Sequence, residues 1–351
     1  MEYILDGMAH GDVATRLLNN NFDQNILRPY IGDNGDHYIT VNQGGKDKAH
    51  VVGNNTATLR KDDWKLLDTA VVKAAKERLR FVADLRSSGL TYSIPQGMGK
   101  TVLETETQSD INPAQISMDA VQRGKSDRPV YELSNLPLPI IHKDFSFSAR
   151  QIQTSRNGGS PLDTSMAELA ARRVAETAEQ LAIGTLSTYS YGGGTIYGAR
   201  NFPQRLTKSM TNPTSTGWTG KTAVSEVLAM KAQSQAALHY GPWRLYTSPA
   251  WDQYLDADYS DAKGDNTLRE RIAKIEGINS VATLDTLPGY EMILIQQTSD
   301  VFREVMGMDI TTVQWASEGG MQFNYKVMAI MVPQPRADQN GNTGIVHGVV
   351  S

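Results

Sequence analysis

Residues 165–183, Ser165-Met-Ala-Glu-Leu-Ala-Ala-Arg-Arg-Val-Ala-Glu-Thr-Ala-Glu-Gln-Leu-Ala-Ile, form the most regular segment of this 351-residue chain. Ser165 and Glu168 have the spacing of a capping box, in which two side chains satisfy amides of the first helical turn. Gly184 follows where glycine commonly ends a helix. Apolar side chains recur at spacings of three and four, which predicts one buried helix face. We expect that face to hold Met166, Leu169, Ala170, Val174, Thr177 and Leu181.

The segments on either side of this helix are unusual for an enzyme. A polar loop, residues 154–160, precedes the helix, and a Ser/Tyr/Gly-rich loop follows it and closes on Tyr197-Gly-Ala-Arg-Asn-Phe-Pro203. Residues 90–142, further upstream, have no helical period. They are followed by Phe145-Ser-Phe147, whose alternation predicts a half-buried strand. Within 90–142 we expect extended runs at 100–107, 114–118 and 129–133.

The first of these runs predicts a strand that belongs to no core. Val102, Glu104 and Glu106 share one strand face, and both faces are mostly polar. A long segment without a core is unusual in a compact domain and suggests a function. A hairpin with about fifteen residues in each arm would reach about 50 Å at ~3.3 Å per residue. Its edges would stay open to solvent unless a neighbouring subunit covered them.

The N-terminal region, residues 1–57, is rich in Asn, Gly and Asp and has too few apolar residues for a core. We expect an arm that is ordered by docking against another part. It is predicted to contain a short helix at 12–18, a docked contact at Leu27–Ile31 and a short strand at His37–Val41. The longest helix is predicted after this arm, over 62–86, where apolar residues keep a helical spacing.

Residues 221–309 predict a compact α/β lobe, because helical and strand patterns alternate there with short connections. Helices are expected at 222–238, after Ser248-Pro249 and at 268–275, and strands at 243–247 and 289–295. After this lobe, two more strands are expected, at 310–315 and 321–332, and a closing strand is expected near 343–346.

Composition excludes several classes of protein. The formal net charge is −4, so the chain lacks the basic surface of a typical nucleic-acid binder. It has no cysteine, which excludes disulfides, cysteine metal sites and a cysteine nucleophile. The N-terminus lacks the basic and apolar regions of a signal peptide. No run of about 18 apolar residues is present, so we expect no transmembrane helix.

Motifs with catalytic or ligand-binding chemistry do not survive inspection. Residues 97–101, Gly-Met-Gly-Lys-Thr, suggest a phosphate loop, but Ile94 stands where its first glycine is needed. A loop with four aspartates has Asp261 and Thr267 where an EF-hand needs Gly and Glu, which leaves adventitious calcium as the alternative to a solvated loop. These aspartates are Asp256, Asp258, Asp261 and Asp265. The six histidines are scattered, and no nucleophile elbow occurs. We therefore predict no catalytic, cofactor-binding or metal-binding residues, no cofactor and no enzymatic activity.

The order of these parts resembles that of tailed-bacteriophage major capsid proteins, whose fold is shared with bacterial encapsulins. Residues 62–68, Asp-Asp-Trp-Lys-Leu-Leu-Asp, look like the entry helix of that family. Leu136-Pro-Leu-Pro139 followed by Phe145-Ser-Phe147 looks like its return strand. Glu179-Gln-Leu-Ala-Ile-Gly184 followed by residues 197–203 looks like its junction between the long helix and the next loop. The resemblance extends over about residues 60–346.

The resemblance implies an α+β fold with an N-terminal arm, an extended β-hairpin loop, a long spine helix, a peripheral body and an axial α/β lobe. The implied domains are an N-terminal arm at 1–60, a peripheral domain at 61–220 with the extended loop at about 90–135 and the spine helix at 165–183, an axial domain at 221–309, and a return to the peripheral domain at 310–351.

The resemblance also implies a structural function. Such chains assemble through pentamers and hexamers into an icosahedral shell that encloses double-stranded DNA. Expected partners are further copies of the chain and scaffolding, portal and decoration proteins. Packaged DNA would be contacted weakly and non-specifically, and no membrane is involved. The expected location is the virion capsid, assembled in the cytoplasm of the bacterial host.

Three alternatives stay open. An encapsulin-like nanocompartment shell would use the same fold around a cargo enzyme. A tail or baseplate protein would form tubes or rings. A soluble enzyme with an irregular lid would need paired carboxylates, for which Glu176 and Glu179 are candidates. We expect both glutamates to lie toward an exposed stripe of their helix, which argues against the enzyme.

Overall fold

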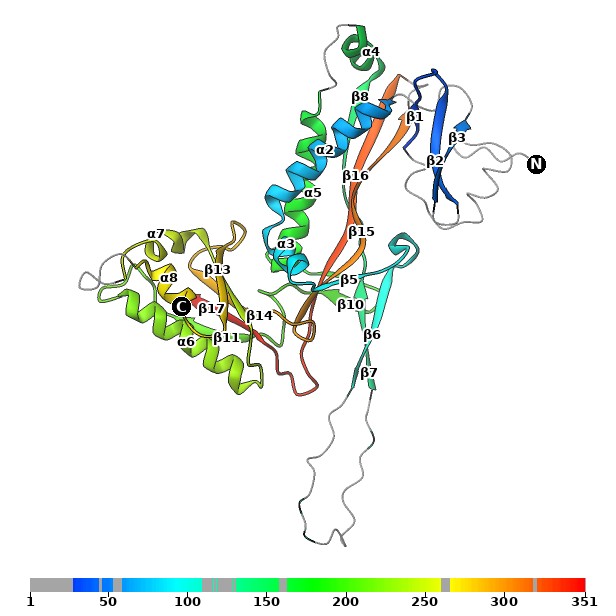
Figure 1. Cartoon of the computed structure of the whole chain (residues 1–351). Coiled ribbons are helices and arrows are strands. Elements are labelled where there is room, and N and C mark those ends of the chain that lie inside the picture. Colours follow the sequence, from blue (N-terminus) through cyan, green and yellow to red (C-terminus); the bar gives the residue numbers. More distant parts are fainter. Residues whose placement is uncertain are drawn as a thin grey trace.

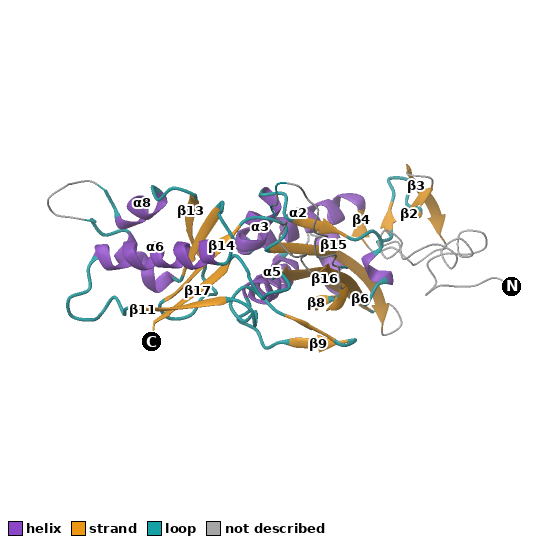
Figure 2. Cartoon of the chain, turned by 90° about the horizontal axis from the view of Figure 1, so that it is seen from below, coloured by secondary structure: helices purple, strands orange, loops and turns teal. Residues whose placement is uncertain are grey.

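The computed structural model describes residues 28–43, 46–52, 59–108, 116, 118, 128, 131–157, 163–259, 266–317 and 321–350. A long body has a small N-terminal sheet near one end and an extended hairpin at the other, and a lobe lies at its side (Figure 1). Seen from below, lobe, body and N-terminal sheet lie in a row and make a broad, thin plate (Figure 2). The helix predicted at 12–18 lies outside the described residues.

The body is built on a four-stranded sheet in the order β5-β15-β16-β8. Its centre is the antiparallel pair of β15 (Phe302–Ser317) and β16 (Gln322–Pro335). β5 (Thr91–Ser93) and β8 (Ile141–Ser148) flank this pair. β15 begins eight residues before the predicted 310, because its first half alternates too irregularly to be recognised around a bulge near Gly307. The predicted alternation of Phe145 and Phe147 is confirmed, since both rings are buried against Tyr325.

Helices cover one face of the body sheet: α2 (Lys61–Arg78), α3 (Arg80–Ser87) and α5 (Ser165–Ile183), with α4 (Ala149–Asn157) at the far end. The single helix predicted over 62–86 is two helices, because the backbone of Leu79 leaves the helical region at φ −83°, ψ 78°. The polar loop predicted at 154–160 is wrong for 154–157, which belong to α4, and 158–160 lie outside the described residues.

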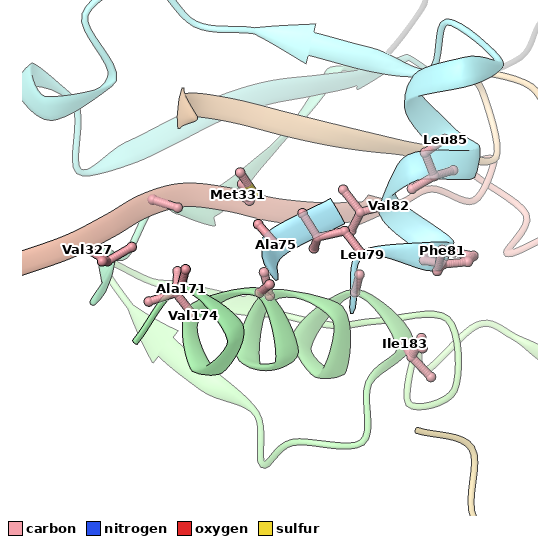
Figure 3. Close-up of a cluster of buried hydrophobic side chains, with 14 of the residues drawn as sticks. Ala75, Leu79, Phe81, Val82, Leu85, Ala171, Val174, Ile183, Val327 and Met331 are labelled. Atoms are coloured by element: carbon pink, nitrogen blue, oxygen red, sulfur yellow. The ribbon is translucent and has the colours of Figure 1, made fainter. Parts of the chain in front are cut away.

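Helix α5 has the predicted bounds, and Ala170, Val174 and Leu181 of the predicted face are buried, but Met166 and Leu169 are not. Met166 is 47% exposed and Leu169 is 56% exposed. The buried side instead carries a stripe of alanines at spacings of three and four, which lets α5 pack closely on α2 and β16 (Figure 3). This stripe consists of Ala167, Ala171, Ala175, Ala178 and Ala182. Hydrophobicity alone predicts that the larger Met166 and Leu169 are buried, whereas the close approach of α5 to α2 requires small side chains at the contact.

The capping box predicted for α5 is also wrong. The exposed carboxylate of Asp163 accepts hydrogen bonds from the Ser165 amide at 2.9 Å and the Ser165 hydroxyl at 2.6 Å. These hydrogen bonds lower the pKa of Asp163. Glu168 accepts a hydrogen bond from the Thr164 hydroxyl at 3.0 Å instead of reaching back to Ser165. An Asp two residues before the first helical residue therefore replaces the expected pair.

The lobe has a five-stranded mixed sheet in the order β11-β17-β14-β12-β13, with helices packed on it. Its strands are β11 (Leu206–Met210), β12 (Trp243–Thr247), β13 (Ile278–Thr283), β14 (Glu291–Gln296) and β17 (Ile345–Val350). Its helices are α6 (Gly220–Ala236), the 3₁₀ turn η3 (Pro249–Trp251), α7 (Asp252–Leu255) and α8 (Leu268–Ala273).

The lobe sheet departs from two predicted domain boundaries. β11, which lies within the predicted peripheral segment 61–220, belongs to the lobe sheet. Residues 310–351 were expected to return to the body, and β15 and β16 lie there. The last strand, β17, instead pairs with β11 and β14 and completes the lobe sheet. Its first four residues, 345–348, are buried because β17 lies between β11 and β14 inside the sheet.

The N-terminal sheet has the order β3-β2-β1-β4 and contains the strand predicted at 37–41. Its elements are β1 (Tyr30–Ile31), β2 (His37–Gln43), β3 (Lys46–Val52) and β4 (Leu59–Arg60). The docked contact predicted near 27–31 is confirmed. Arg28 pairs with Asp68 of α2 at 2.5 Å and lies over the Trp64 ring, and the Trp64 indole donates to the carbonyl of Pro29.

Candidate functional site: the extended hairpin and its base

The extended hairpin pairs β6 (Val102–Gln108) with β7 (Tyr131–Pro137) in antiparallel register, from Val102↔Pro137 to Gln108↔Tyr131. The paired part has seven residues in each strand, about 20 Å at ~3.3 Å per residue. It forms a separate two-stranded sheet that projects away from the body (Figure 1). A two-stranded ribbon is at best marginally stable in water, so a further contact is expected to hold it.

Burial falls off along the hairpin. Leu136 and Pro137 are buried at its base, and Leu136 joins an apolar cluster with Ile196 and Val313. Further out, Tyr131 is 58% exposed and Leu133 is 65% exposed. The carboxylates predicted to share one strand face, Glu104 and Glu106, are exposed as expected for a strand outside the core. Most of residues 109–130 lie outside the described residues.

The near side of the hairpin base is held by a contact between two glycines. Gly97 lies in the short turn η2 (Gly97–Gly99), directly against Gly307 at the bulge in β15. A Cβ on Gly97 would overlap the backbone of Gly307. Ile94 donates its amide to the carbonyl of Met306 at 2.8 Å, which fixes the chain just before this turn. The segment that suggested a phosphate loop therefore serves as the hairpin's anchor.

On the β7 side, the base of the hairpin contacts a second, smaller hairpin of β9 (Tyr189–Tyr191) and β10 (Gly194–Ile196). Gly194 lies against the carbonyl of Asn135, and a Cβ there would overlap it. The Asn135 side chain donates to the carbonyl of Gly192 at 3.0 Å. The Ser/Tyr/Gly-rich segment, which the sequence predicts only as a loop, thus forms a hairpin that contacts β7 at the base of the extended hairpin.

Gly97→Ala is expected to destabilise the subunit by about 1–3 kcal/mol, because the added methyl group must push the η2 turn away from β15. Gly99→Ala, in the same turn, meets no atom within 4 Å and is the matched control, with a change of about 0.5 kcal/mol or less. Urea denaturation of both variants measures the difference. Equal stabilities would show that the glycine contact does not hold the base.

A groove of about 820 Å³ lies between the hairpin base, the β9–β10 hairpin and the edge of the lobe. Its lining is mainly polar, with Thr107, Glu132, Asp300 and Arg336, and Leu133 and Tyr197 add apolar surface. The groove lies between the hairpin base and the lobe.

Where the chain passes from α5 into the lobe, a cluster of charged residues fixes it. Arg200 pairs with Glu291 of β14 through two hydrogen bonds of 2.7 and 2.8 Å. The His347 ring of β17 lies 3.0 Å from the same carboxylate. Burial opposes the negative charge of Glu291, but Arg200 and His347 outweigh it and lower the pKa to about 2.

The stability of the subunit should therefore depend on Glu291 in acid. Because its pKa is below the ordinary 4.5 in the folded chain, its contribution is complete above pH 4.5 and is lost as pH falls toward 2. The shift corresponds to at most about 3 kcal/mol. Glu291→Gln should flatten the denaturation profile in this range. A profile unchanged by the substitution would contradict the assignment.

The residues weighed from sequence for catalysis or metal binding do not come together. Asp256 pairs with Arg269, and Asp258 lies in an isolated bridge with Thr267, while Asp261 and Asp265 are outside the described residues. In the part of the chain that the structure describes, no group of His, Asp or Glu could hold a metal ion. No helix in that part is long and apolar enough to cross a membrane.

The two glutamates of the enzyme alternative have different surroundings. Glu176 pairs with Arg172, Arg173 and Arg78. Burial opposes its charge, yet these arginines lower its pKa. Glu179 is only 3% exposed, so the prediction that both face an exposed stripe is wrong for Glu179. Its carboxyl group instead accepts hydrogen bonds from backbone amides of α3.

Comparison with known proteins places the fold. The model of the family described as "Family of unknown function (DUF6260)" matches residues 54–348. Type 1 encapsulin shell protein EncA of Myxococcus xanthus (strain DK1622) is 25% identical over 203 residues, which are 56% of this chain and 64% of EncA. The match thus spans less than two thirds of that relative.

Among solved structures, a virus-like particle from Pyrococcus furiosus is similar with a TM-score of 0.58 at 14% identity, covering 82% of this chain and 99% of that chain. The capsid of Myoviridae phage XM1 follows with 0.55 at 8%, covering 72% and 86%. The capsid of a native GTA particle gives 0.54 at 12%, covering 78% and 91%. These likenesses confirm the predicted fold, the one shared by phage major capsid proteins and encapsulins.

Proposed function

Because the chain belongs to the family described as "Family of unknown function (DUF6260)" and has a capsid-like shell fold, we propose that it is the major capsid protein of a tailed bacteriophage. One observation carries the proposal. The capsid chains of phage XM1 and of the native GTA particle match 72% and 78% of this chain and 86% and 91% of their own lengths. The proposed product is an icosahedral shell of pentamers and hexamers around double-stranded DNA.

The shape of the subunit supports assembly with further copies. Closed shells need heterologous contacts that repeat by symmetry. The extended hairpin has open strand edges and exposed Tyr131 and Leu133, which a neighbouring subunit would cover. The groove beside the hairpin would receive part of that neighbour. The lobe would form the axial domain around five- and six-fold axes, with the body as the peripheral domain.

The charge of the chain fits a wall that holds DNA without gripping it. A net charge of −4 supplies few of the basic contacts on which phosphate affinity depends. The shell would form in the cytoplasm of the bacterial host, with scaffolding, portal and decoration proteins as partners, and would become the virion capsid. In this proposal the chain performs no catalysis.

Expression of the full chain alone tests the proposal, with size-exclusion chromatography, light scattering and negative-stain microscopy as readouts. Round shells, or rings of five or six subunits, are the expected products. A monomer that stays unassembled when scaffolding protein is co-expressed would overturn the proposal.

An encapsulin-like compartment is the second candidate, and the match to EncA favours it. Particles purified from the source cells separate the two. Nuclease-resistant double-stranded DNA inside the shell supports the capsid. A co-purified enzyme inside shells without DNA supports the compartment.

A further inference from the structure

The carboxyl group of Glu179 lies where three helices meet. α2 ends at Arg78, and α3 starts at Arg80 after the break at Leu79. Glu179 of α5 accepts hydrogen bonds from the amides of Phe81 at 2.5 Å and Val82 at 3.2 Å. The first amides of a helix have no partner within the helix, and the two carboxyl oxygens of Glu179 supply one for each of these two amides. The spine helix thus caps α3 through one buried side chain.

The helix that Glu179 caps also holds the lobe. Asp84 of α3 pairs with Arg244 at 2.8 Å and accepts a hydrogen bond from the Tyr246 hydroxyl at 3.2 Å, and both partners belong to β12. The rings of Phe81 and Tyr246 meet edge to face at 5.0 Å. α3 is therefore a link between the spine helix and the lobe, and a loosened cap would act on both.

The charged groups around this carboxyl group are matched with one another. They come from α2, α3, α5 and the lobe, and a cleft of about 260 Å³ opens among them beside Glu179. None of the ion pairs between described residues includes Glu179. The ion pairs near Glu179 are Arg78 with Glu176 and Asp285, Arg80 with Asp285, and Asp84 with Arg244, and Arg86 of α3 pairs with Glu304 of β15.

Burial raises the pKa of Glu179 to about 7; backbone hydrogen bonds oppose the shift, and the charge of Asp84 adds to it. The buried carboxyl group therefore binds its proton more tightly than a carboxyl group in water, with its ordinary pKa of 4.5. By linkage, the closed arrangement is most stable below about pH 4.5 and loses stability as pH rises through 7.

We propose that Glu179 and α3 form a proton-controlled latch between the spine helix and the lobe. With the proton bound, the carboxyl group stays buried and α3 keeps its contacts with β12. With the proton lost, the charge is drawn toward water in the adjoining cleft, the cap of α3 opens more often, and the lobe is released more readily. The latch is a property of the subunit and does not depend on which kind of shell the chain builds.

Hydrogen exchange of the full chain tests the latch, with peptides resolved by mass spectrometry and rates corrected for intrinsic exchange. Between pH 5.5 and 8, the opening equilibrium of residues 80–87 should rise by about tenfold or more. Peptides from β12 should follow it, and peptides from the body strand β16 should not. A flat profile at α3, or a rise at α3 that β12 does not share, would overturn the proposal.

Two variants assign the effect to one group. Glu179→Gln removes the titration and should flatten the profile of α3. Glu176→Gln, three residues earlier on the same helix and lining the same cleft, should keep the wild-type rise. A rise that persists in Glu179→Gln would reject the proposal. Should this variant fail to fold, the wild-type profiles of α3, β12 and β16 still decide.

Discussion

Replacing residues 105–134 by Asn-Gly is expected to give a folded subunit that no longer assembles into shells. The replacement joins Glu104 to Asn135, which face each other in the ladder, through a two-residue turn that suits an antiparallel pair. It removes the outer part of the hairpin with Tyr131 and Leu133 but keeps the buried base. Losing ~3 kcal/mol from a contact repeated around a shell would reduce assembly by roughly a hundredfold.

Where the cut is made matters for this experiment. A deletion that begins inside the η2 turn, such as residues 98–130, would destroy the turn that holds Gly97 against Gly307. Urea denaturation of the shortened chain should match wild type within about 1 kcal/mol, because none of the removed residues whose side chains the structure describes is buried. Sedimentation or light scattering then reports assembly. Normal shells from this chain would reject the role of the hairpin.

The long elements of this fold were predictable because local pattern and tertiary packing agree there. α5 ends at Gly184, whose φ of 89° suits glycine, and the sequence placed both ends of the helix correctly. The same holds for β12, where four of the five predicted strand residues are buried. The alternation of Phe145 and Phe147 likewise survives because one strand face meets the core.

The parts that sequence reasoning missed depend on residues distant along the chain. The break at Leu79 is stabilised by Glu179, which lies a hundred positions further along the chain. The sequence pattern of residues 62–86 therefore does not predict the break. Met166 and Leu169 were wrongly placed on the buried face of α5 because they are more hydrophobic than alanine, whereas close packing on α2 selects the alanines. The glycine anchor at Gly97 needs Gly307, and that pairing is visible only in three dimensions.

Arg86→Met should be the most destabilising single substitution considered, at about 3–5 kcal/mol, because it leaves a buried charge without its partner. Arg86 forms a two-pronged pair with Glu304, with both distances 2.9 Å, and Glu304 is 2% exposed. Burial works against the charge of Arg86, yet Glu304 and Asp309 raise its pKa above the usual value. Such a loss is a large fraction of the ~5–15 kcal/mol that stabilises a typical domain.

Two comparisons make this result specific to the buried charge. The double variant Arg86→Met/Glu304→Met should recover to within about 1 kcal/mol of wild type, because an apolar pair can replace a buried ion pair without a stranded charge. The sulfur atoms of Met306 and Met331 already lie 3.7 and 3.4 Å from the guanidinium group, so the surroundings suit methionine. Arg173→Met, at an exposed pair with Glu176, should change stability by less than about 1 kcal/mol. An Arg86→Met variant as stable as Arg173→Met would contradict the prediction. It would mean that Glu304 finds water or another partner once Arg86 is gone, and that the ion pair does not hold α3 against β15.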